Sequence, residues 1–292
     1  MNRPETLVLQ APAKINLSLD ILRRRKDGYH DLCMVMQQIA LCDLVHIRIL
    51  PEPGIHLSTN AEFLPVNHQN IAWQAAELLG TRAGINLSDS GIELIIEKRI
   101  PVSAGLAGGS ADAAAVLKGL NQLWRLGLSL GELQKFGLEL GADVPYCLQG
   151  GTALAEGIGE QLTPLKMPKD LWVVLVKPPV SISTKEVYKR FEFEKVMKRP
   201  DTIALIEAMN RFELTAMADT MANVLESVTL SMVPEISEIK RKLIEYNAFA
   251  SFMTGSGPAV FGLFKTAEKA RAAGTKMSRL YREVHITHTV RN

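Results

Sequence analysis

A glycine-rich segment of small residues is the strongest candidate for chemistry in this sequence. It reads PVSAGLAGGS over residues 101–110, between a predicted strand at 91–97 and an alanine-rich stretch that predicts a helix from about Ser110 to Trp124. Glycines allow several backbone N–H groups to converge, and the N-terminus of the following helix adds a positive dipole end, so the segment suits phosphate. A glycine-rich turn with Ser110 as helix N-cap is the structural alternative, and the segment alone favours neither.

The segment lacks the signatures of the common nucleotide-binding motifs. It contains neither the GxxxxGK[ST] of P-loop proteins nor the GxGxxG of dinucleotide-binding folds. The HRD and DFG sequences of protein kinases are also absent from the chain. If the segment binds phosphate, it therefore belongs to a different class of protein.

Several other polar residues have ordinary structural interpretations when each is taken alone. Lys14 and Asn16 share the polar face of residues 13–22, whose strict alternation predicts a half-buried strand, so Lys14 alone is typical of a solvated strand lysine. Asp143 precedes Val144-Pro145 and alone is typical of a helix cap. The Tyr29-His30 pair alone is typical of packing beside a surface imidazole.

Three motifs, in chain order and at matching distances, resemble those of the GHMP kinases (galactose, homoserine, mevalonate and phosphomevalonate kinases). The first is APAKINL at 11–17, the second is the 101–110 segment, and the third is FMTGSGPAVF at 252–261, a glycine loop that closes over the active site. Three further segments extend the resemblance over essentially the whole chain, towards members that phosphorylate cytidylyl-methylerythritol: GYH at 28–30, GADVP at 141–145 and GGTA at 150–153.

The resemblance implies roles at the phosphoryl end of the site. Lys14 would lie beside the transferred phosphate, and Asp143 would accept the proton of the attacking hydroxyl. ATP, with Mg²⁺, is the implied cofactor, and Asn70 would contact adenine, although a helix-capping role explains Asn70 equally well. The residues implied to bind the ATP phosphates are Pro101, Gly105, Leu106, Ala107, Gly108, Gly109 and Ser110.

The resemblance also implies how the acceptor substrate is bound. His30 would hydrogen-bond the cytosine edge, Tyr29 would pack near the base, and Tyr188 would stack on it with Thr184 nearby. Asn16 would reach the same substrate group as Lys14, because the two share a strand face. The third motif would contribute Gly255, Ser256 and Gly257.

Some positions depart from the family pattern or keep a structural interpretation. Ala111 follows Ser110 where a second serine is usual, which leaves open whether a second hydroxyl contacts magnesium or phosphate. Ala107 replaces a frequent glycine, and Ile158 stands where a basic residue is expected. Asp112 is assigned a structural role. His285 and His288 lie on opposite faces of an expected strand and make no metal pair. The Arg23–Lys26 run is interpreted as a solvated turn or, alternatively, as a charge that attracts a diphosphate substrate.

The pattern of elements predicts an α+β protein with two layered domains. Asn70 is expected to cap a helix, and Ser129 with Glu132 forms a capping box for a helix that Gly141 ends. A hinge is expected at 164–168. The later expected elements are a strand at 171–177, helices at 185–191, 201–210, 213–226 and 234–246, strands at 249–253 and 258–264, a helix at 266–281 and a strand at 283–290.

The resemblance refines this expectation to the GHMP kinase fold. It implies a ribosomal-S5-like N-terminal domain over residues 1–163, which holds the phosphate-binding loop, and a ferredoxin-like C-terminal domain over 164–292.

Composition excludes several function classes. The 292 residues carry a formal net charge of +2, too balanced for a nucleic-acid partner. The three cysteines (Cys33, Cys42 and Cys147) form no CxxC and indicate reduced thiols. The N-terminal stretch 1–14 lacks a signal-peptide core, and no apolar run approaches the ~18 residues that span a bilayer. A cytoplasmic protein with no membrane partner is therefore expected, with the oligomeric state left open.

The implied reaction is ATP-dependent phosphorylation of the 2-hydroxyl of cytidylyl-methylerythritol, in the non-mevalonate (methylerythritol phosphate) route of isoprene biosynthesis. Another GHMP kinase acting on a small alcohol, of the homoserine or mevalonate type, is the nearest alternative, and the GYH segment argues against it. A non-catalytic ligand sensor and a ribosomal or RNA-binding protein are alternatives from other classes. Lys14 with Asp143 disfavours the sensor, and the near-neutral charge disfavours the RNA-binding protein.

Overall fold

The computed structural model describes residues 6–167 and 169–291, in which the chain forms two compact units. Unit 1 consists of residues up to 13, 42–100 and 107–149, and unit 2 of 14–41, 101–106 and residues from 150 onward. Strands β1 (Thr6–Arg24) and β2 (His30–Leu50) contribute to both. The expected boundary between residues 163 and 164 falls inside unit 2. Pro168 of the expected hinge and residues 1–5 of the N-terminal stretch lie outside the described residues.

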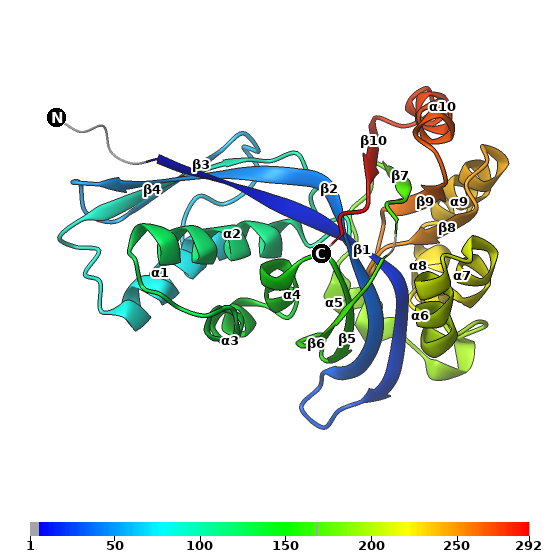
Figure 1. Cartoon of the computed structure of the whole chain (residues 1–292), viewed down its shortest axis with the longest axis horizontal. Coiled ribbons are helices and arrows are strands. Elements are labelled where there is room, and N and C mark those ends of the chain that lie inside the picture. The colour runs from blue at the N-terminus through cyan, green and yellow to red at the C-terminus, as the bar shows by residue number, and fades with distance from the viewer. Residues whose placement is uncertain (1–5, 168, 292) are drawn as a thin grey trace. The chain divides into compact units, whose positions relative to one another are not determined.

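Unit 1 is a layer of strands covered by helices (Figure 1). Strand β4 pairs in parallel with β3 and antiparallel with the second half of β2, where Leu44 lies opposite Glu97. Helix α2 approaches the sheet closely at Gly119, where a Cβ atom would lie 2.4 Å from Ile47 Cδ1. The elements are β3 (Ile55–Thr59), α1 (Ile71–Ala83), β4 (Gly91–Glu97), α2 (Gly108–Leu123), α3 (Leu130–Leu140) and α4 (Val144–Gln149).

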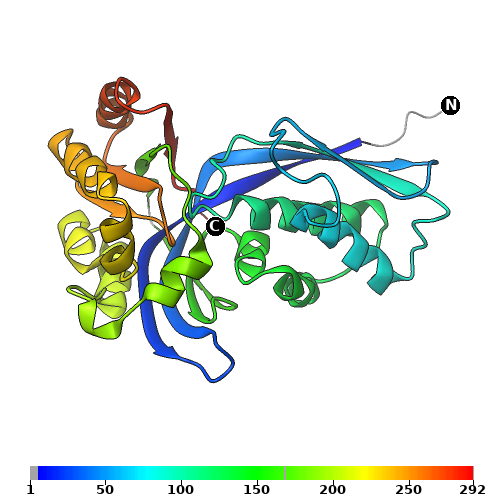
Figure 2. The same cartoon turned by 180° about the vertical axis from the view of Figure 1, so that it is seen from behind.

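Unit 2 contains two groups of strands (Figure 2). In the first group, the N-terminal half of β2 pairs antiparallel with β5 (Thr152–Gly157), which pairs with β6 (Gln161–Leu165). The second group is an antiparallel sheet in the order β10-β7-β9-β8, against which α9 and α10 pack. Its strands are β7 (Trp172–Lys177), β8 (Ala250–Met253), β9 (Val260–Phe264) and β10 (Glu283–His288).

The helices of unit 2 fall mostly between β7 and β8 in the chain. They are α5 (Thr184–Arg190), the 3₁₀ turn η1 (Phe193–Lys195), α6 (Thr202–Arg211), α7 (Leu214–Thr220), α8 (Glu226–Met232), α9 (Glu235–Glu245) and, after β9, α10 (Ala267–Ser278).

The segment after β10 is tied to β2 through the buried amide of Gln37. This amide donates to the backbone carbonyls of Gln38 and Val290, at 2.8 Å each, and accepts the Thr152 hydroxyl at 2.7 Å. The backbone N–H of Val290 donates in turn to the carbonyl of Gln38. Residues far apart in the sequence are thereby joined within unit 2.

Several local predictions are confirmed. Asn70 caps α1 by accepting from the N–H of Ala72, and Ser129 forms the full capping box with Glu132 at the start of α3. Gly141 follows the last residue of α3 and donates to the carbonyl of Gly137. Each of these depends only on residues close together in the sequence.

Three expectations about elements are wrong. The single helix expected at 213–226 is two helices, because the chain is extended at Met221 and Asn223 forms a β-bridge with Leu19. The strand expected at 13–22 is longer and is not half-buried, since its polar residues are covered as well as its apolar ones. Ser110 is not the N-cap of α2, which begins two residues earlier.

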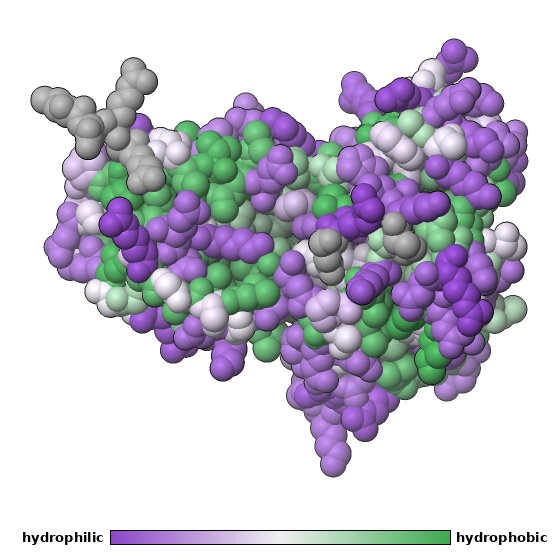
Figure 3. Space-filling model, in the orientation of Figure 1, coloured by the Kyte–Doolittle hydropathy of each residue, from purple (hydrophilic) through white to green (hydrophobic). Residues whose placement is uncertain are grey.

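No helix within residues 6–167 and 169–291 has both the length and the apolar character needed to cross a membrane. The face drawn in Figure 3 mixes hydrophilic and hydrophobic residues in both units.

Candidate active site

The second glycine motif ends, in unit 1, as the uncapped start of helix α2. Ala107 precedes the helix in a left-handed conformation (φ 56°) and its side chain caps no N–H group. The first N–H groups of a helix have no partner inside the helix, so those of Gly108, Gly109 and Ser110 are available to an anion. The hydroxyl of Ser110 has no hydrogen-bond partner among the described residues.

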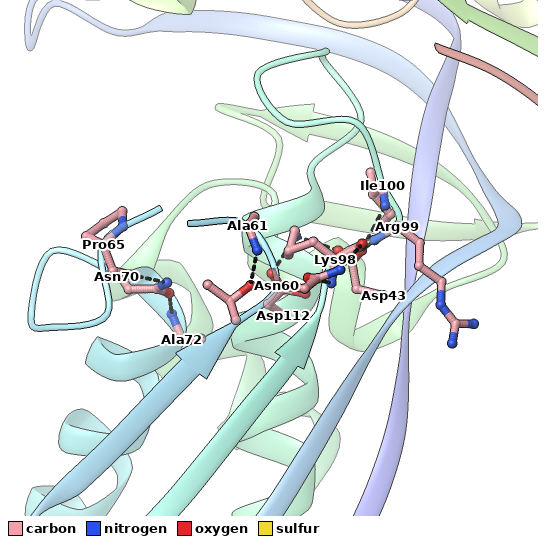
Figure 4. A network of polar contacts seen from close by, with 11 residues as sticks. Asp43, Asn60, Ala61, Pro65, Asn70, Ala72, Lys98, Arg99, Ile100 and Asp112 are labelled. Atoms are coloured by element: carbon pink, nitrogen blue, oxygen red, sulfur yellow. Dashed lines mark hydrogen bonds and ion pairs between the residues drawn. The ribbon is translucent and has the colours of Figure 1, made fainter. Parts of the chain in front are cut away.

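A buried ion-pair cluster lies directly behind this helix start (Figure 4). The ammonium of Lys98 contacts the carboxylates of Asp43 at 2.5 Å and Asp112 at 2.7 Å, and all three side chains are almost fully buried. The other oxygen of Asp43 accepts the backbone N–H groups of Arg99 and Ile100. Lys98 thus connects the chain that enters the glycine segment with the first turn of α2 that leaves it.

The cluster has one more carboxylate than ammonium groups, and this imbalance falls on Asp112. Burial raises the pKa of Asp112 to about 7, an effect that Lys98 opposes and the nearby Asp43 reinforces. One of its oxygens, Oδ1, is buried without a partner among the described residues. Asp112 therefore has the expected structural role, as a buried partner of Lys98 whose pKa is strongly raised.

Asn70 and Asp143 are the other candidate residues of unit 1. Both ends of the Asn70 amide are engaged, since its oxygen accepts the N–H of Ala72 and its nitrogen donates to the carbonyl of Pro65. The capping role of Asn70 is confirmed, and its contact with adenine stays a prediction. Asp143 is half-buried before α4, and its carboxylate has no hydrogen-bond partner among the described residues, so it caps no helix. Its role as proton acceptor stays a prediction.

In unit 2, the Lys14 side chain is buried rather than solvated. It is only 4% exposed, and its ammonium donates to Oδ1 of Asn16 at 2.8 Å. The same oxygen accepts the backbone N–H of Gly255 at 3.0 Å. Lys14 and Asn16 from the first motif therefore meet Gly255 from the third motif, and their contacts with substrate stay predictions.

The third glycine loop also contacts the beginning of the second motif. The Thr254 hydroxyl donates to the carbonyl of Gly105 at 3.2 Å, and Gly105 adopts a φ of 78°. A Cβ atom on Gly105 would lie 2.2 Å from the Thr254 carbonyl oxygen, so only glycine fits. Residues 254–257 are buried, which makes this loop a packed part of unit 2.

The residues expected at the cytosine end also lie in unit 2, and two of them are paired. The rings of His30 and Tyr188 lie 5.4 Å apart between centroids, with 41° between their planes. Burial, and secondarily the charge of Arg24, lowers the pKa of His30, which favours a neutral imidazole with one donor and one acceptor. Tyr29 is 60% exposed, and the hydroxyl of Thr184 lies 2.8 Å from that of Ser256.

Within the described residues, no three histidine, cysteine, aspartate or glutamate side chains gather as a metal site. In nucleotide-dependent kinases Mg²⁺ is bound mainly by phosphates and water, with one or two protein ligands. The free hydroxyl of Ser110 fits this limited contribution, whereas Ala111 is buried and offers no ligand atom.

Sequence reasoning missed the residues that support the motifs from outside them. Asp43 and Lys98 hold the glycine segment, and Asn223 holds the third loop through two carbonyl groups. Each is a single polar residue in an ordinary sequence context. Only the fold brings them to the motifs.

Comparison with known proteins identifies the class. Residues 70–151 match the model of the GHMP kinases N terminal domain, and residues 195–283 match the model of the GHMP kinases C terminal domain. The chain belongs to the GHMP kinase family, and its α+β fold is the fold of that family.

More specific relatives share most of the sequence. The chain is 51% identical over 284 residues to the 4-diphosphocytidyl-2-C-methyl-D-erythritol kinase of Alkaliphilus oremlandii, covering 97% of this chain and 96% of the relative. It is 49% identical to the kinase of that name from Alkaliphilus metalliredigens, covering 96% of each. A crystal structure of 4-(cytidine 5'-diphospho)-2C-methyl-D-erythritol kinase superposes with a TM-score of 0.84 at 32% identity, covering 98% of this chain and all of that one.

Proposed function

We propose that this protein transfers the γ-phosphoryl group of ATP to the 2-hydroxyl of 4-diphosphocytidyl-2-C-methyl-D-erythritol, in the non-mevalonate route to isoprenoid precursors. The observation that carries the proposal is the 51% identity over 97% of the chain to a kinase of that name. The pairing of His30 with Tyr188 supports recognition of a base, because a neutral imidazole can hydrogen-bond the cytosine edge beside a stacking ring.

The proposed step moves one phosphoryl group and one proton. The 2-hydroxyl oxygen attacks the γ-phosphorus, the bond to the β–γ bridging oxygen breaks, and ADP leaves with the electron pair. Asp143 accepts the hydroxyl proton, a role supported by its unengaged carboxylate. Lys14 stabilises the charge on the transferred group, and its orientation comes from Asn16.

The N–H groups at the start of α2 bind the ATP phosphates, and the helix dipole adds to their effect. Ser110 is the candidate protein ligand for the Mg²⁺ that would accompany ATP and would neutralise phosphate charge. Lys98 and its carboxylates are buried and keep this helix start in place.

A direct assay tests the proposal against the small-alcohol alternatives. The purified protein is incubated with Mg-ATP and, separately, with the cytidylyl alcohol, homoserine or mevalonate, and the products are identified by mass spectrometry. We expect a mass increase of one phosphoryl group only for the cytidylyl alcohol, with one ADP formed per product. Phosphorylated homoserine or mevalonate without the cytidylyl product would contradict the proposal, and no ADP formation with any acceptor would favour a ligand sensor.

A further inference from the structure

The segment that follows α7 supports the third glycine loop along its backbone. Asn223 donates through its amide nitrogen to the carbonyl oxygens of Met253 at 2.9 Å and Gly255 at 2.8 Å. Glu226 accepts the N–H of Met253 at 2.8 Å, and the Thr229 hydroxyl donates to the carbonyl of the loop residue Ser256 at 3.3 Å. Residues 223–229 therefore hold four backbone groups of the loop.

Asn223 is the centre of this support. It is 4% exposed, and its side-chain oxygen accepts the N–H of Leu225, so all its strong hydrogen-bonding directions inside the fold are fixed. Its β-bridge with Leu19 joins it to the same strand that carries Lys14 and Asn16. A buried amide with these contacts is rigid, because each lost bond would leave an unpaired group.

The two peptide groups that flank the Gly255 α-carbon are held from two sides. Asn223 donates to the Gly255 carbonyl, while the Gly255 N–H donates to Asn16 Oδ1. The same oxygen of Asn16 accepts the Lys14 ammonium. A displacement of the loop would therefore move the acceptor that orients Lys14.

We infer that Asn223 is a positioning residue for phosphoryl transfer, which sets the Lys14 ammonium through Gly255 and Asn16. The inference rests on the role proposed above for Lys14. Asn223 is buried within the fold, and its effect is expected on the chemical step, because displacing a charged group by about 1 Å can change rates by roughly 10²-fold. Asn16 is also a positioning residue in this arrangement, since its side-chain oxygen accepts both the Lys14 ammonium and the Gly255 N–H.

The kinetic test compares Asn223→Ala with Ser227→Ala. Ser227 is a matched control, because it lies in the same segment and its hydroxyl bonds only the Val224 carbonyl, at 2.7 Å. We expect Asn223→Ala to lower kcat by roughly 10- to 100-fold with both KM values nearly unchanged, and Ser227→Ala to resemble the wild type. A folded Asn223→Ala enzyme with wild-type kcat would overturn the inference.

A double-mutant cycle tests the route through Asn16. If Asn223 acts through Gly255 and Asn16, adding Asn223→Ala to Asn16→Ala costs far less kcat than it does in the wild type. Fully multiplicative losses would exclude that route. Thr229→Val is the milder second variant should Asn223→Ala fail to fold, since it removes only the bond to the Ser256 carbonyl. It is expected to lower kcat to a smaller extent, and an unchanged kcat would count against the support of the loop.

A third measurement is independent of turnover and therefore of the proposed function. Deuterium uptake by peptides covering residues 251–257 should rise in Asn223→Ala and stay at the wild-type level in Ser227→Ala, because the carbonyl contacts that fix the loop are lost only in the first. Equal uptake in all three proteins would overturn the inference even if the wild type is inactive on the cytidylyl alcohol. An inactive wild type by itself refutes only the proposed function.

Discussion

Asp143 and His30 are assigned to opposite ends of the acceptor substrate, so their substitutions should have separable kinetic effects. Asp143→Asn keeps the shape of the side chain but cannot accept a proton. We expect kcat to fall by roughly 10²- to 10⁴-fold, the usual effect of losing a general base, with little change in the KM for the cytidylyl alcohol. Steady-state kinetics on the folded variant gives both parameters, and a near-normal kcat would remove Asp143 from the proton transfer.

His30→Ala should act on binding of the cytidine end. The imidazole lies beside Tyr188 and is proposed to contact the base, which is remote from the reacting hydroxyl. The KM for the cytidylyl alcohol is expected to rise while the KM for ATP stays nearly constant, and some loss of kcat is expected if remote binding energy orients the alcohol. His56→Ala, at an exposed histidine of unit 1, is the control. An unchanged cytidylyl KM would show that the cytosine pocket lies elsewhere.

The raised pKa of Asp112 has a consequence for stability. The pKa of this carboxyl group is about 7 in the folded protein, whereas in the unfolded chain the group ionises near its ordinary pKa of 3.8. The folded state thus binds the extra proton between these values, so the contribution of Asp112 to the free energy of unfolding falls as pH rises from about 4 to about 7.

Asp112→Asn removes this titration. Relative to the wild type, the variant should gain stability as pH rises from 5 to 7, by at most about 1.4 kcal/mol per pH unit, and the difference should level off above pH 7. Urea denaturation at pH 5, 6, 7 and 8 measures it, with Asp219→Asn as the control at an exposed, unpaired aspartate. A difference that does not change with pH would show that Asp112 is ionised throughout this range.

At the scale of elements, the contact between the second and third glycine motifs depends on the absence of one side chain. Gly105→Ala places a methyl group against the Thr254 carbonyl in addition to straining the backbone at φ 78°. Gly127→Ala imposes similar strain at φ 67° with nothing within 4 Å. We therefore expect Gly127→Ala to lose about 1 kcal/mol of stability, and Gly105→Ala to lose more and also to lower kcat.

Thermal unfolding and kinetics of the two variants test this expectation. Equal destabilisation with unaltered turnover in Gly105→Ala would mean that the two loops can separate without cost.

The parts of the site that could be predicted from the sequence are those formed by residues close together in the chain. The three glycine-containing motifs, the Asn70 cap and the Ser129 capping box depend on short spacings. The resemblance assigns His30 and Tyr188 each to the cytosine end, and the structure places their rings 5.4 Å apart between centroids. The assignments of these residues to substrates stay predictions.

The rest could not be predicted because it depends on distant residues. The alternation at 13–22 predicted a solvated polar face, but in the fold Asn16 accepts the N–H of Gly255 and Asp20 accepts a hydrogen bond from Arg199. Helical periodicity continued through Met221, and tertiary pairing of Asn223 with Leu19 broke the expected helix. The Asp43–Lys98–Asp112 cluster combines residues from β2, the end of β4 and α2, and no local pattern connects them.

At the scale of the whole chain, Gln37 holds together segments from three regions of the sequence. Gln37→Leu keeps the approximate volume but leaves the carbonyl of Val290 and the hydroxyl of Thr152 without their buried partner. We expect a loss of about 1–3 kcal/mol in the free energy of unfolding, because buried polar groups lose their partners. Urea denaturation measures the loss, and Gln69→Leu at an exposed position is the control. A loss no larger than that of the control would show that water replaces the amide.

The bond between Gln37 and Val290 also dictates an order of events during protein synthesis. All residues of unit 1 have left the ribosome once residue 149 has emerged, so this unit can fold while translation continues. The first half of β2 is synthesised early, but Gln37 and Ile39 gain their partners at residues 289–290 only after those residues have been made. Until then only the end of this strand at residues 38–39 lacks its partners, because residues 32–37 can already pair with β5, so pairing with other nascent chains would be confined to that short stretch.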